Sequence, residues 1–366
     1  MIEDLKHYGF NWHKQELKYE TPKRPVRKTY KQPWHEYNLS KTQEKLFFLN
    51  FLHEAVESLD IEDNYIGKGR YPHLIQDMIK CMCIKVYNKS ASRNIISDLK
   101  LLQGFGHIFK VPHFNIISKY MSSKDTTKYL QDLITITSEP LKEIDTIASA
   151  DATGFSTFNK RDWIDVRMSQ RLKKDFKKLH ILTGVKSNTV ISAKVTEGTC
   201  ADSNYLPYLL EKSIYFDLKE VSADKGYLSI KNCEAIAKIG ATPFIMPKKN
   251  TQGATAKKGS AWYKMIRFWK NNESLFRRHY HKRSNVESTF AMIKRNYLPY
   301  VRSKSYTGQV NEVLIKIICH NLAVLIMSIF EYGINVDKFR LLNSNADNLE
   351  SHNDSSESTL KQESSR

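Results

Sequence analysis

Two aspartates stand where short β-rich stretches end. Asp151 follows the run 146–150 (TIASA), and Asp224 follows the run 218–223 (LKEVSA). Carboxylates at strand ends lie at the rim of a sheet, where α/β proteins place their chemistry. Two facing carboxylates repel each other unless a cation separates them, and Mg²⁺ prefers oxygen ligands. The pair therefore predicts metal-assisted chemistry, although aspartates that merely cap the following turns would look the same.

A third segment carries four chemically different side chains at helical spacing: Tyr280, Arg283, Glu287 and Lys294. Steps of three, four and seven residues place all four on one face of a helix predicted over 280–297. Arginine and lysine suit phosphate contact, and glutamate suits a metal ligand. An exposed ion pair between Arg283 and Glu287 is the structural alternative. The opposite face is apolar and would dock on the sheet: Val286, Phe290 and Ile293.

From about residue 139 to 338 strands and helices alternate, which predicts a mixed α/β domain. The runs 179–185 and 189–195 flank Lys186-Ser187-Asn188 and predict a hairpin. Proline has no N–H to donate to a neighbouring strand, so Pro243 predicts that the run 241–246 lies at an edge. Further helices are expected at 203–210 and at 229–239, the latter closed by Gly240.

Residues 45–138 carry apolar side chains at helical spacing and predict an all-α domain. Ser90 is expected to cap one helix and Pro112 to open the next, with a glycine-containing turn between them. This is the pattern of a DNA-binding helix-turn-helix, and it also occurs in many helical bundles. Residues 1–44 are expected to form a basic arm, either extended along phosphates or simply solvated.

The 57 Lys and Arg residues outnumber the 39 Asp and Glu residues by 18, which indicates a polyanionic partner. The acidic, serine-rich tail 339–366 is expected to be disordered. Eleven bases and one acid, interleaved with aromatic residues, fall within 246–283, so the insertion 247–279 is predicted to clamp DNA. An amphipathic helix at 261–276 that buries its aromatic rings is the alternative. The predicted DNA contacts are Lys248, Lys249, Lys257, Lys258 and Trp262.

Cysteine spacing and hydropathy bear on the class of protein. Five cysteines without paired spacing support neither a disulfide framework nor a zinc module, and they favour a reducing cytoplasm. The first residues do not have the basic and apolar regions of a secretory signal. The most apolar stretch, 313–330, contains Lys316, His320 and Asn321, so a buried helix is expected there and no membrane partner.

Three motifs together resemble insertion-sequence transposases of the Asp-Asp-Glu class. Tyr280-x2-Arg283-x3-Glu287-x6-Lys294 is similar to their helix signature, and Asp224-Lys225-Gly226-Tyr227 to their second-aspartate motif. Asp151-Ala152-Thr153-Gly154 resembles the first-aspartate strand, and 319–322 (CHNL) resembles part of the terminal helix. The resemblance covers about residues 70–330, and no acid of the expected triad is substituted.

This resemblance implies an α/β fold with a ribonuclease-H-like core. In it, Asp151, Asp224 and Glu287 would be the catalytic triad and would bind two Mg²⁺ or Mn²⁺ ions. Tyr280, Arg283 and Lys294 would hold phosphates of the transposon end. The implied activity is metal-dependent cleavage at terminal inverted repeats and strand transfer into target DNA. The protein would act on double-stranded DNA as a homodimer or larger assembly, in the cytoplasm of a prokaryote, associated with the nucleoid.

Three other aspartates compete for the first position of the triad: Asp145, Asp162 and Asp165. Asp145 precedes its strand, and the other two would point to opposite faces of a strand. Two other functions stay open, namely a catalytically silent DNA-binding protein and a metal-dependent nuclease without strand transfer. The intact triad disfavours the first, while the helical unit and the basic insertion disfavour the second.

Overall fold

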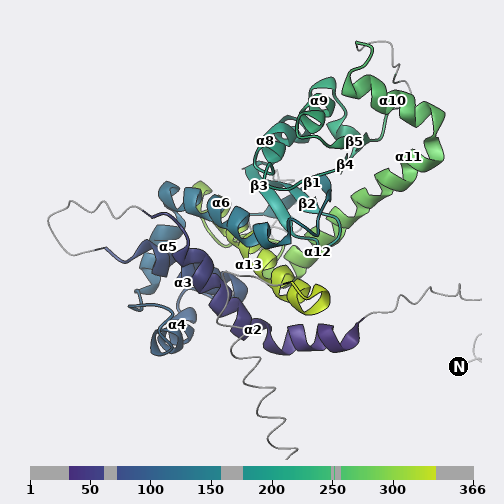
Figure 1. Cartoon of the computed structure of the whole chain (residues 1–366). Helices are drawn as coiled ribbons and strands as arrows, with labels where there is room; N and C mark the ends of the chain where they lie inside the picture. The colour runs from purple at the N-terminus through teal and green to yellow at the C-terminus, as the bar shows by residue number, and fades with distance from the viewer. Residues whose placement is uncertain (1–32, 62–71, 158–175, 249–250, 252–256, 335–366) are drawn as a thin grey trace, which may run out of the picture. The chain divides into compact units, whose positions relative to one another are not determined.

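Five strands form one mixed sheet in the computed structural model, which describes residues 33–61, 72–157, 176–248, 251 and 257–334. Their order across the sheet is β3-β2-β1-β4-β5. β1, β2 and β3 pair antiparallel, whereas β4 and β5 run parallel to β1 (Figure 1). This is the ribonuclease-H-like arrangement that the resemblance implies, and the predicted fold class is confirmed. The strands are β1 (Ile147–Ser156), β2 (Phe176–Gly184), β3 (Val190–Glu197), β4 (Glu220–Ala223) and β5 (Thr242–Ile245).

β1 does not end at Asp151, as the sequence pattern predicts, but continues to Ser156. The reason is its partner β2, which pairs with β1 from Ala148 to Ser156. On the other side, β4 pairs with β1 only as far as Ala150. Asp151 is therefore at the point where one neighbouring strand stops, and not where its own strand stops.

The predicted hairpin between β2 and β3 is confirmed, and two features shape its turn. Asn188 has a φ of 67°, a left-handed conformation that asparagine tolerates better than most residues. The buried carboxylate of Asp145 accepts the backbone N–H groups of Lys186 at 2.8 Å and Ser187 at 3.2 Å. Asp145, one of the rivals for the triad, is thereby engaged in holding the turn. Asp162 and Asp165 lie outside the described residues.

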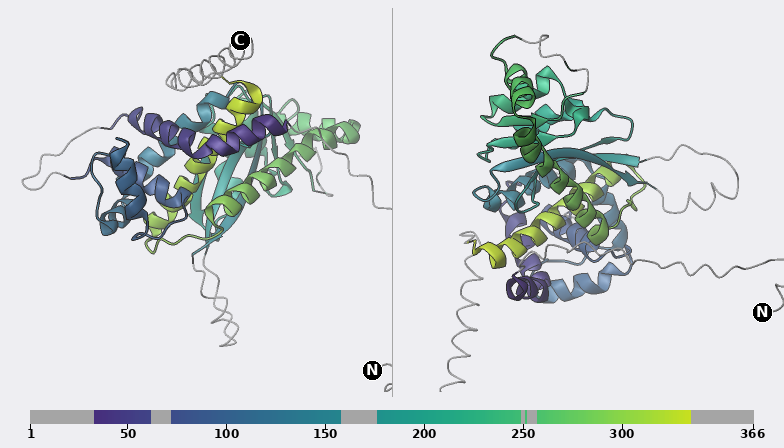
Figure 2. Two further views of the ribbon diagram at one scale, coloured as in Figure 1. Left: turned by 90° about the horizontal axis from the view of Figure 1, so that it is seen from below. Right: turned by 90° about the vertical axis from the view of Figure 1, so that its right-hand side faces the viewer.

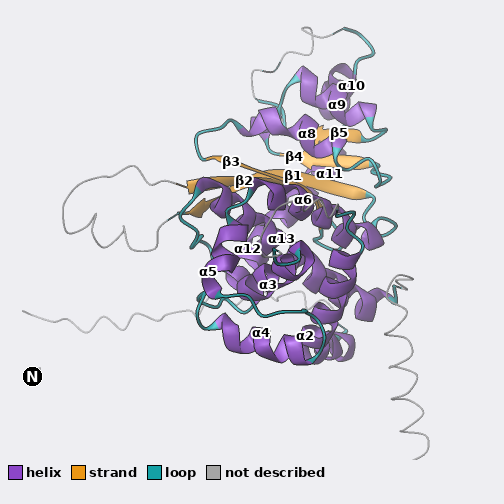
Figure 3. Cartoon of the chain, turned by 90° about the vertical axis from the view of Figure 1, so that its left-hand side faces the viewer, coloured by secondary structure: helices purple, strands orange, loops and turns teal. Residues whose placement is uncertain are grey.

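Helices cover both faces of the sheet, as Figures 2 and 3 show. One face packs against a group of helices that follow β3, β4 and β5, and Ala148 and Ala150 of β1 point into that core. The other face, with Phe155 of β1, packs against helices from the middle and the end of the described chain. The first group comprises α8 (Leu206–Glu211), α9 (Ile230–Lys238), α10 (Ala261–Asn271) and α11 (Glu273–Tyr280); the second comprises α6 (Lys124–Ser138), α12 (Ser284–Tyr297) and α13 (Tyr306–Tyr332).

The region predicted to be helical contains α2 (Trp34–Glu57), α3 (Ile75–Tyr87), α4 (Ile95–Gly104), α5 (Phe114–Met121) and α6. α2 begins at Trp34, so the last eleven residues of the predicted arm are helical, and α4 begins after Asn94, the position of its N-cap, rather than after Ser90. One apolar cluster runs from α2 through α3 and α13 to the sheet, so this region shares its core with the α/β part. The basic residues 18–31 and the predicted tail lie outside the described residues.

α13 is long and apolar enough to cross a membrane by length and composition alone. In this structure 78% of its most apolar window is buried inside the protein, against α6, α3 and β3. The polar residues of α13 have partners there: the Lys316 ammonium, for example, donates to the carbonyls of Leu298 (2.9 Å) and Tyr300 (2.5 Å). The predicted buried helix is confirmed.

Candidate active site

The parallel pairing of β1 and β4 brings Asp151 and Asp224 side by side. Ala150 is the register partner of Ala223, and an aspartate follows each of them. Side chains alternate between the faces of a strand, so both aspartates share the face of Ser149 and Ser222. α12 covers this face of the sheet. The backbone therefore places the two acids next to each other, as the sequence predicts.

The predicted continuous helix over 280–297 is wrong. α11 ends at Tyr280, the tighter turn His281–Arg283 follows, and α12 begins at Ser284. Contacts to two strands hold this break in place. Glu220 of β4 contacts His279 Nδ1 and Lys282 Nζ, each at 2.9 Å, and the Ser149 hydroxyl of β1 donates to the carbonyl of Arg283 at 3.3 Å.

Despite the break, the four signature side chains lie near Asp151, Asp224 and the adjoining part of β1. The Arg283 guanidinium bridges two carboxylates, with Nη1 3.4 Å from Asp151 Oδ2 and Nη2 2.8 Å from Glu287 Oε1. The Tyr280 hydroxyl lies 3.5 Å from Asp224 Oδ1. The Lys294 ammonium donates to the Thr153 hydroxyl of β1 at 2.6 Å. The structure thus brings together Asp151, Asp224, Glu287, Tyr280, Arg283 and Lys294.

Burial and negative neighbours set the electrostatics of Asp151. Burial raises the pKa of its carboxyl, and the charges of Asp224 and Asp202 raise it further. The N–H of Ala152, 2.8 Å from Oδ1, and the Arg283 guanidinium oppose this, but the net pKa is above the ordinary value. The site therefore concentrates negative charge that a cation would stabilise.

Asp202 is a further acid at this site that the sequence pattern does not single out. It begins the turn before α8, and its carboxylate pairs with Lys178 Nζ of β2 at 2.6 Å. The buried hydroxyl of Tyr227 has no hydrogen-bond partner among the described residues. Burial raises its pKa, and the negative charges of Asp202, Asp151 and Asp224 raise it further. The only sequence signal for Asp202 is its place between a strand and a helix, which is equally typical of a helix cap.

The donors of this site suit a divalent cation in kind. Asp151, Asp224 and Glu287 offer carboxylate oxygens, the ligands that Mg²⁺ and Mn²⁺ prefer. Among the residues that the structure describes, no three acidic, histidine or cysteine side chains converge closely enough to hold a metal. Arg283 explains this, because its guanidinium lies between Asp151 and Glu287. The Glu287 side chain is 59% exposed and has room to turn toward the aspartates.

The basic insertion is only partly as predicted. Lys248, Lys257 and Lys258 are exposed, as DNA contacts would have to be, and Lys249 lies outside the described residues. Trp262, however, is 7% exposed and belongs to the core that α9 and α10 form against the sheet. A base cannot stack on a ring in that position, so the prediction for Trp262 is corrected in favour of the packed amphipathic helix.

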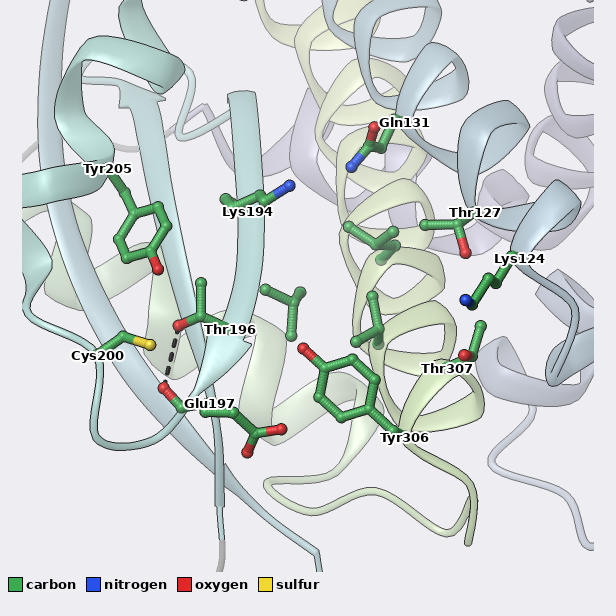
Figure 4. A pocket seen from close by; sticks show the side chains of 13 residues that line it. Lys124, Thr127, Gln131, Lys194, Thr196, Glu197, Cys200, Tyr205, Tyr306 and Thr307 are labelled. Carbon is green, nitrogen blue, oxygen red and sulfur yellow. Dashed lines mark hydrogen bonds between the residues drawn. The ribbon is translucent and has the colours of Figure 1, made fainter.

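A cavity of about 540 Å³ lies beside the site, between the edge strand β3, α6 and the start of α13 (Figure 4). Tyr205, Tyr306 and Lys194 point toward it from different elements. Thr196 connects its wall to the site, since its hydroxyl contacts His180 Nε2 at 2.9 Å and His180 Nδ1 is 3.6 Å from Asp202. Its lining mixes aliphatic, aromatic, thiol and both kinds of charged groups, and does not select one chemical class of ligand.

Comparison with known proteins relates the segment that holds this site to one family. Residues 143–322 match the family described as the transposase DDE domain. Among solved structures, the chain is similar to one in the cryo-EM structure of the piggyBac transposase synaptic complex with hairpin DNA. The two are 13% identical, with 87% of this chain and 80% of that chain covered and a TM-score of 0.38.

Proposed function

We propose, from the premise that this chain belongs to the DDE class of transposases through residues 143–322, that it cleaves the ends of an insertion sequence and joins them to target DNA. The observation that carries the proposal is the placement of Asp151 and Asp224 beside each other by the parallel pairing of β1 and β4, with Glu287 tied to Asp151 through Arg283. We assign the catalytic triad to these three acids. The protein would work in a prokaryotic cytoplasm, associated with the nucleoid, as a dimer or larger assembly on paired DNA ends.

Asp151, Asp224 and Glu287 are the residues that would hold Mg²⁺ or Mn²⁺, two ions in the proposed scheme. Bound there, such ions supply a Lewis acid that favours in-line attack of water or a DNA 3′-hydroxyl on the phosphodiester and stabilises the leaving oxygen. The partial burial that raises the pKa of Asp151 would also strengthen the interactions between the charges of the site, because less polar surroundings screen them less.

The other signature residues would position the DNA. Arg283 has two terminal nitrogens that already contact carboxylate oxygens, and the same fork fits two oxygens of a phosphate. Lys294 is half-buried and its burial lowers the pKa of its ammonium, so a phosphate beside it would restore the lost solvation. The Tyr280 hydroxyl would orient Asp224, which it already contacts, or donate to the same phosphate. Lys248, Lys257 and Lys258 would follow the backbone beyond the site.

The decisive experiment gives the purified protein Mg²⁺ and DNA that carries the inverted repeats flanking its gene. We expect nicks at the repeat ends and joined products with a target. Asp224→Asn should abolish both and keep DNA binding, because a metal ligand is not a phosphate anchor. Asp217→Asn is a matched control, since Asp217 is exposed and pairs with Lys219 away from the triad. Wild-type protein that binds the repeats but never nicks them would instead be a silent DNA-binding protein, and nicks without joined products would indicate a nuclease.

A further inference from the structure

A second pocket, of about 500 Å³, lies between the helical region and the loop that precedes α13. Its wall carries three cationic side chains, Lys85, Arg302 and Lys304, together with six serines. Among its described lining residues there is no acid. Ammonium, guanidinium and hydroxyl donors without a carboxylate form a wall that favours an oxyanion.

Lys85 is the cation of this wall that a bound anion would stabilise most directly. It is half-buried on α3, and the described residues offer its ammonium no hydrogen bond or ion pair. Burial lowers the pKa of Lys85, and the neighbouring Arg302 lowers it further, while Glu312 acts in the opposite direction. An anion seated between Lys85 and Arg302 would stabilise both cations.

The loop that presents Arg302 is held in position by its own contacts. The buried carboxylate of Glu312 accepts the N–H groups of Arg302 at 2.9 Å and Ser303 at 2.8 Å. The Arg302 guanidinium donates to the carbonyl of Lys89 at 2.8 Å, and Ser305 caps α13. These contacts hold the loop in place, so it needs no ordering when a ligand binds. The carboxylate of Glu312 offsets only part of the positive charge, because the wall carries three cations.

β1 connects this pocket to the candidate active site. The last residue of β1, Ser156, bridges to Tyr300, two residues before Arg302. Asp151 lies five residues back along the same strand, a span of about 17 Å at 3.4 Å per residue. A DNA duplex advances about 3.4 Å per base pair, so about five base pairs cover that span.

We propose that this pocket binds a phosphate of the DNA backbone and is a second anchor for the DNA whose end reaches the triad. This proposal rests on the proposed function, because the ligand of the pocket would be the DNA on which the protein acts. Inorganic phosphate presents the same oxygens, so the experiment includes both ligands.

The test measures binding of a random-sequence duplex in EDTA by fluorescence anisotropy at several salt concentrations. We expect the double variant Lys85→Gln, Lys304→Gln to bind about tenfold more weakly, with the slope of log affinity against log salt reduced by about 0.9, the loss of one phosphate contact. The matched control is Lys231→Gln, Lys238→Gln, which removes two exposed lysines of α9 and should change neither value. Ser118→Asp on α5 places a carboxylate in the same wall without removing a cation, and should also weaken binding.

Melting temperatures near that of the wild type establish that the variants are folded. Unchanged duplex affinity and slope in either the double variant or Ser118→Asp, with the fold intact, would overturn the proposal. So would variants that lose binding of inorganic phosphate, measured by calorimetry, but bind duplex as the wild type does. Catalysis is a separate readout. If the wild type binds duplex through the pocket but never cleaves repeat ends, the proposed reaction is refuted and the proposed DNA binding by the pocket is supported.

Discussion

Arg283 occupies the position that decides the state of the acidic site. Its guanidinium pairs with both Asp151, at 3.4 Å, and Glu287, at 2.8 Å, and offsets one of their two negative charges. A divalent cation would have to compete with it for these oxygens. Arg283 therefore stabilises the site without a metal. If a divalent cation displaced the guanidinium, it could bind a phosphate instead.

Removing this guanidinium should tighten metal binding while impairing catalysis. We expect Arg283→Ala to bind Mn²⁺ about fivefold more tightly at pH 7.5, which corresponds to about 1 kcal/mol for a partly exposed ion pair. DNA cleavage should fall in the same variant because the phosphate contact is lost. Mn²⁺ binding measured by electron paramagnetic resonance provides the readout. Arg295→Ala, which removes an exposed arginine of α12, is the control, and equal Mn²⁺ affinity in both variants would show that Arg283 does not compete with the ion.

For single side chains, the sequence predicts the positions that depend on spacing along the chain. It does not predict those that depend on how the elements pack. Asp151 and Asp224 could be paired in advance because each follows a short β-rich run, and neighbouring strands bring such positions together. Trp262 could not be placed, because an aromatic residue among lysines fits a DNA contact and a buried helix face equally well. Asp202 was missed since only the fold reveals that a turn after β3 lies beside β1.

Among the elements, α13 stabilises the β2–β3 hairpin through buried polar side chains. Asn321 Oδ1 accepts the N–H of Val190 at 2.8 Å, and the His320 ring contacts the carbonyl of Asn188 at 2.9 Å. These contacts fix the hairpin against α13. From the sequence, this helix is visible only as an apolar stretch that contains three polar residues. The same contacts also make the packing sensitive to acid.

Burial lowers the pKa of His320 to about 4, from 6.5 for an exposed imidazole. Because the folded pKa is the lower one, the unfolded chain takes up the proton first, and stability is lost as the pH falls from 6.5 toward 4. Between pH 8 and pH 5 this group should cost about 2 kcal/mol of unfolding free energy. Urea unfolding of His320→Gln at both pH values should show a loss smaller than that of the wild type by this amount. An identical loss would mean that His320 is already charged in the folded protein.

The hairpin also depends on the absence of a side chain at Gly184. A Cβ at this position would overlap the carboxylate of Asp145, which holds the turn. Gly184→Ala should therefore destabilise the protein by about 3 kcal/mol, through overpacking and the loss of those hydrogen bonds. Gly104→Ala is the control, since a Cβ at the end of α4 meets nothing within 4 Å. Equal melting temperatures for the two variants would contradict the role of Asp145.

At this scale the sequence predicts which elements exist better than where they end. β1 was expected to stop at Asp151, and its extension to Ser156 comes from pairing with β2 over the whole length. The interruption after Tyr280 comes from contacts with Glu220 and Ser149 on two strands. Both are tertiary effects, which local spacing does not encode.

Across the whole molecule, the structure shows where part of the excess of 18 positive charges lies. Exposed lysines occur in the insertion, and three further cations line the serine-rich pocket, whereas Asp151 and Asp224 form a separate acidic group. Net charge alone predicts affinity for polyanions, and it does not tell where on the protein the DNA runs. That question needs variants in which whole clusters are neutralised.

Neutralising Lys257, Lys258 and Lys264 with glutamine tests the insertion as the DNA clamp. All three are exposed, so substitution should leave the fold intact. If each contacts one phosphate, the salt slope of duplex binding should fall by up to about 2.7, since each contact contributes about 0.9. Combined with the pocket variants at Lys85 and Lys304, the losses in log affinity should add if one duplex touches both places, because separated sites that bind independently act additively. A combined variant no weaker than the worse of its parents would mean that the two clusters bind alternative DNA segments and not one continuous duplex.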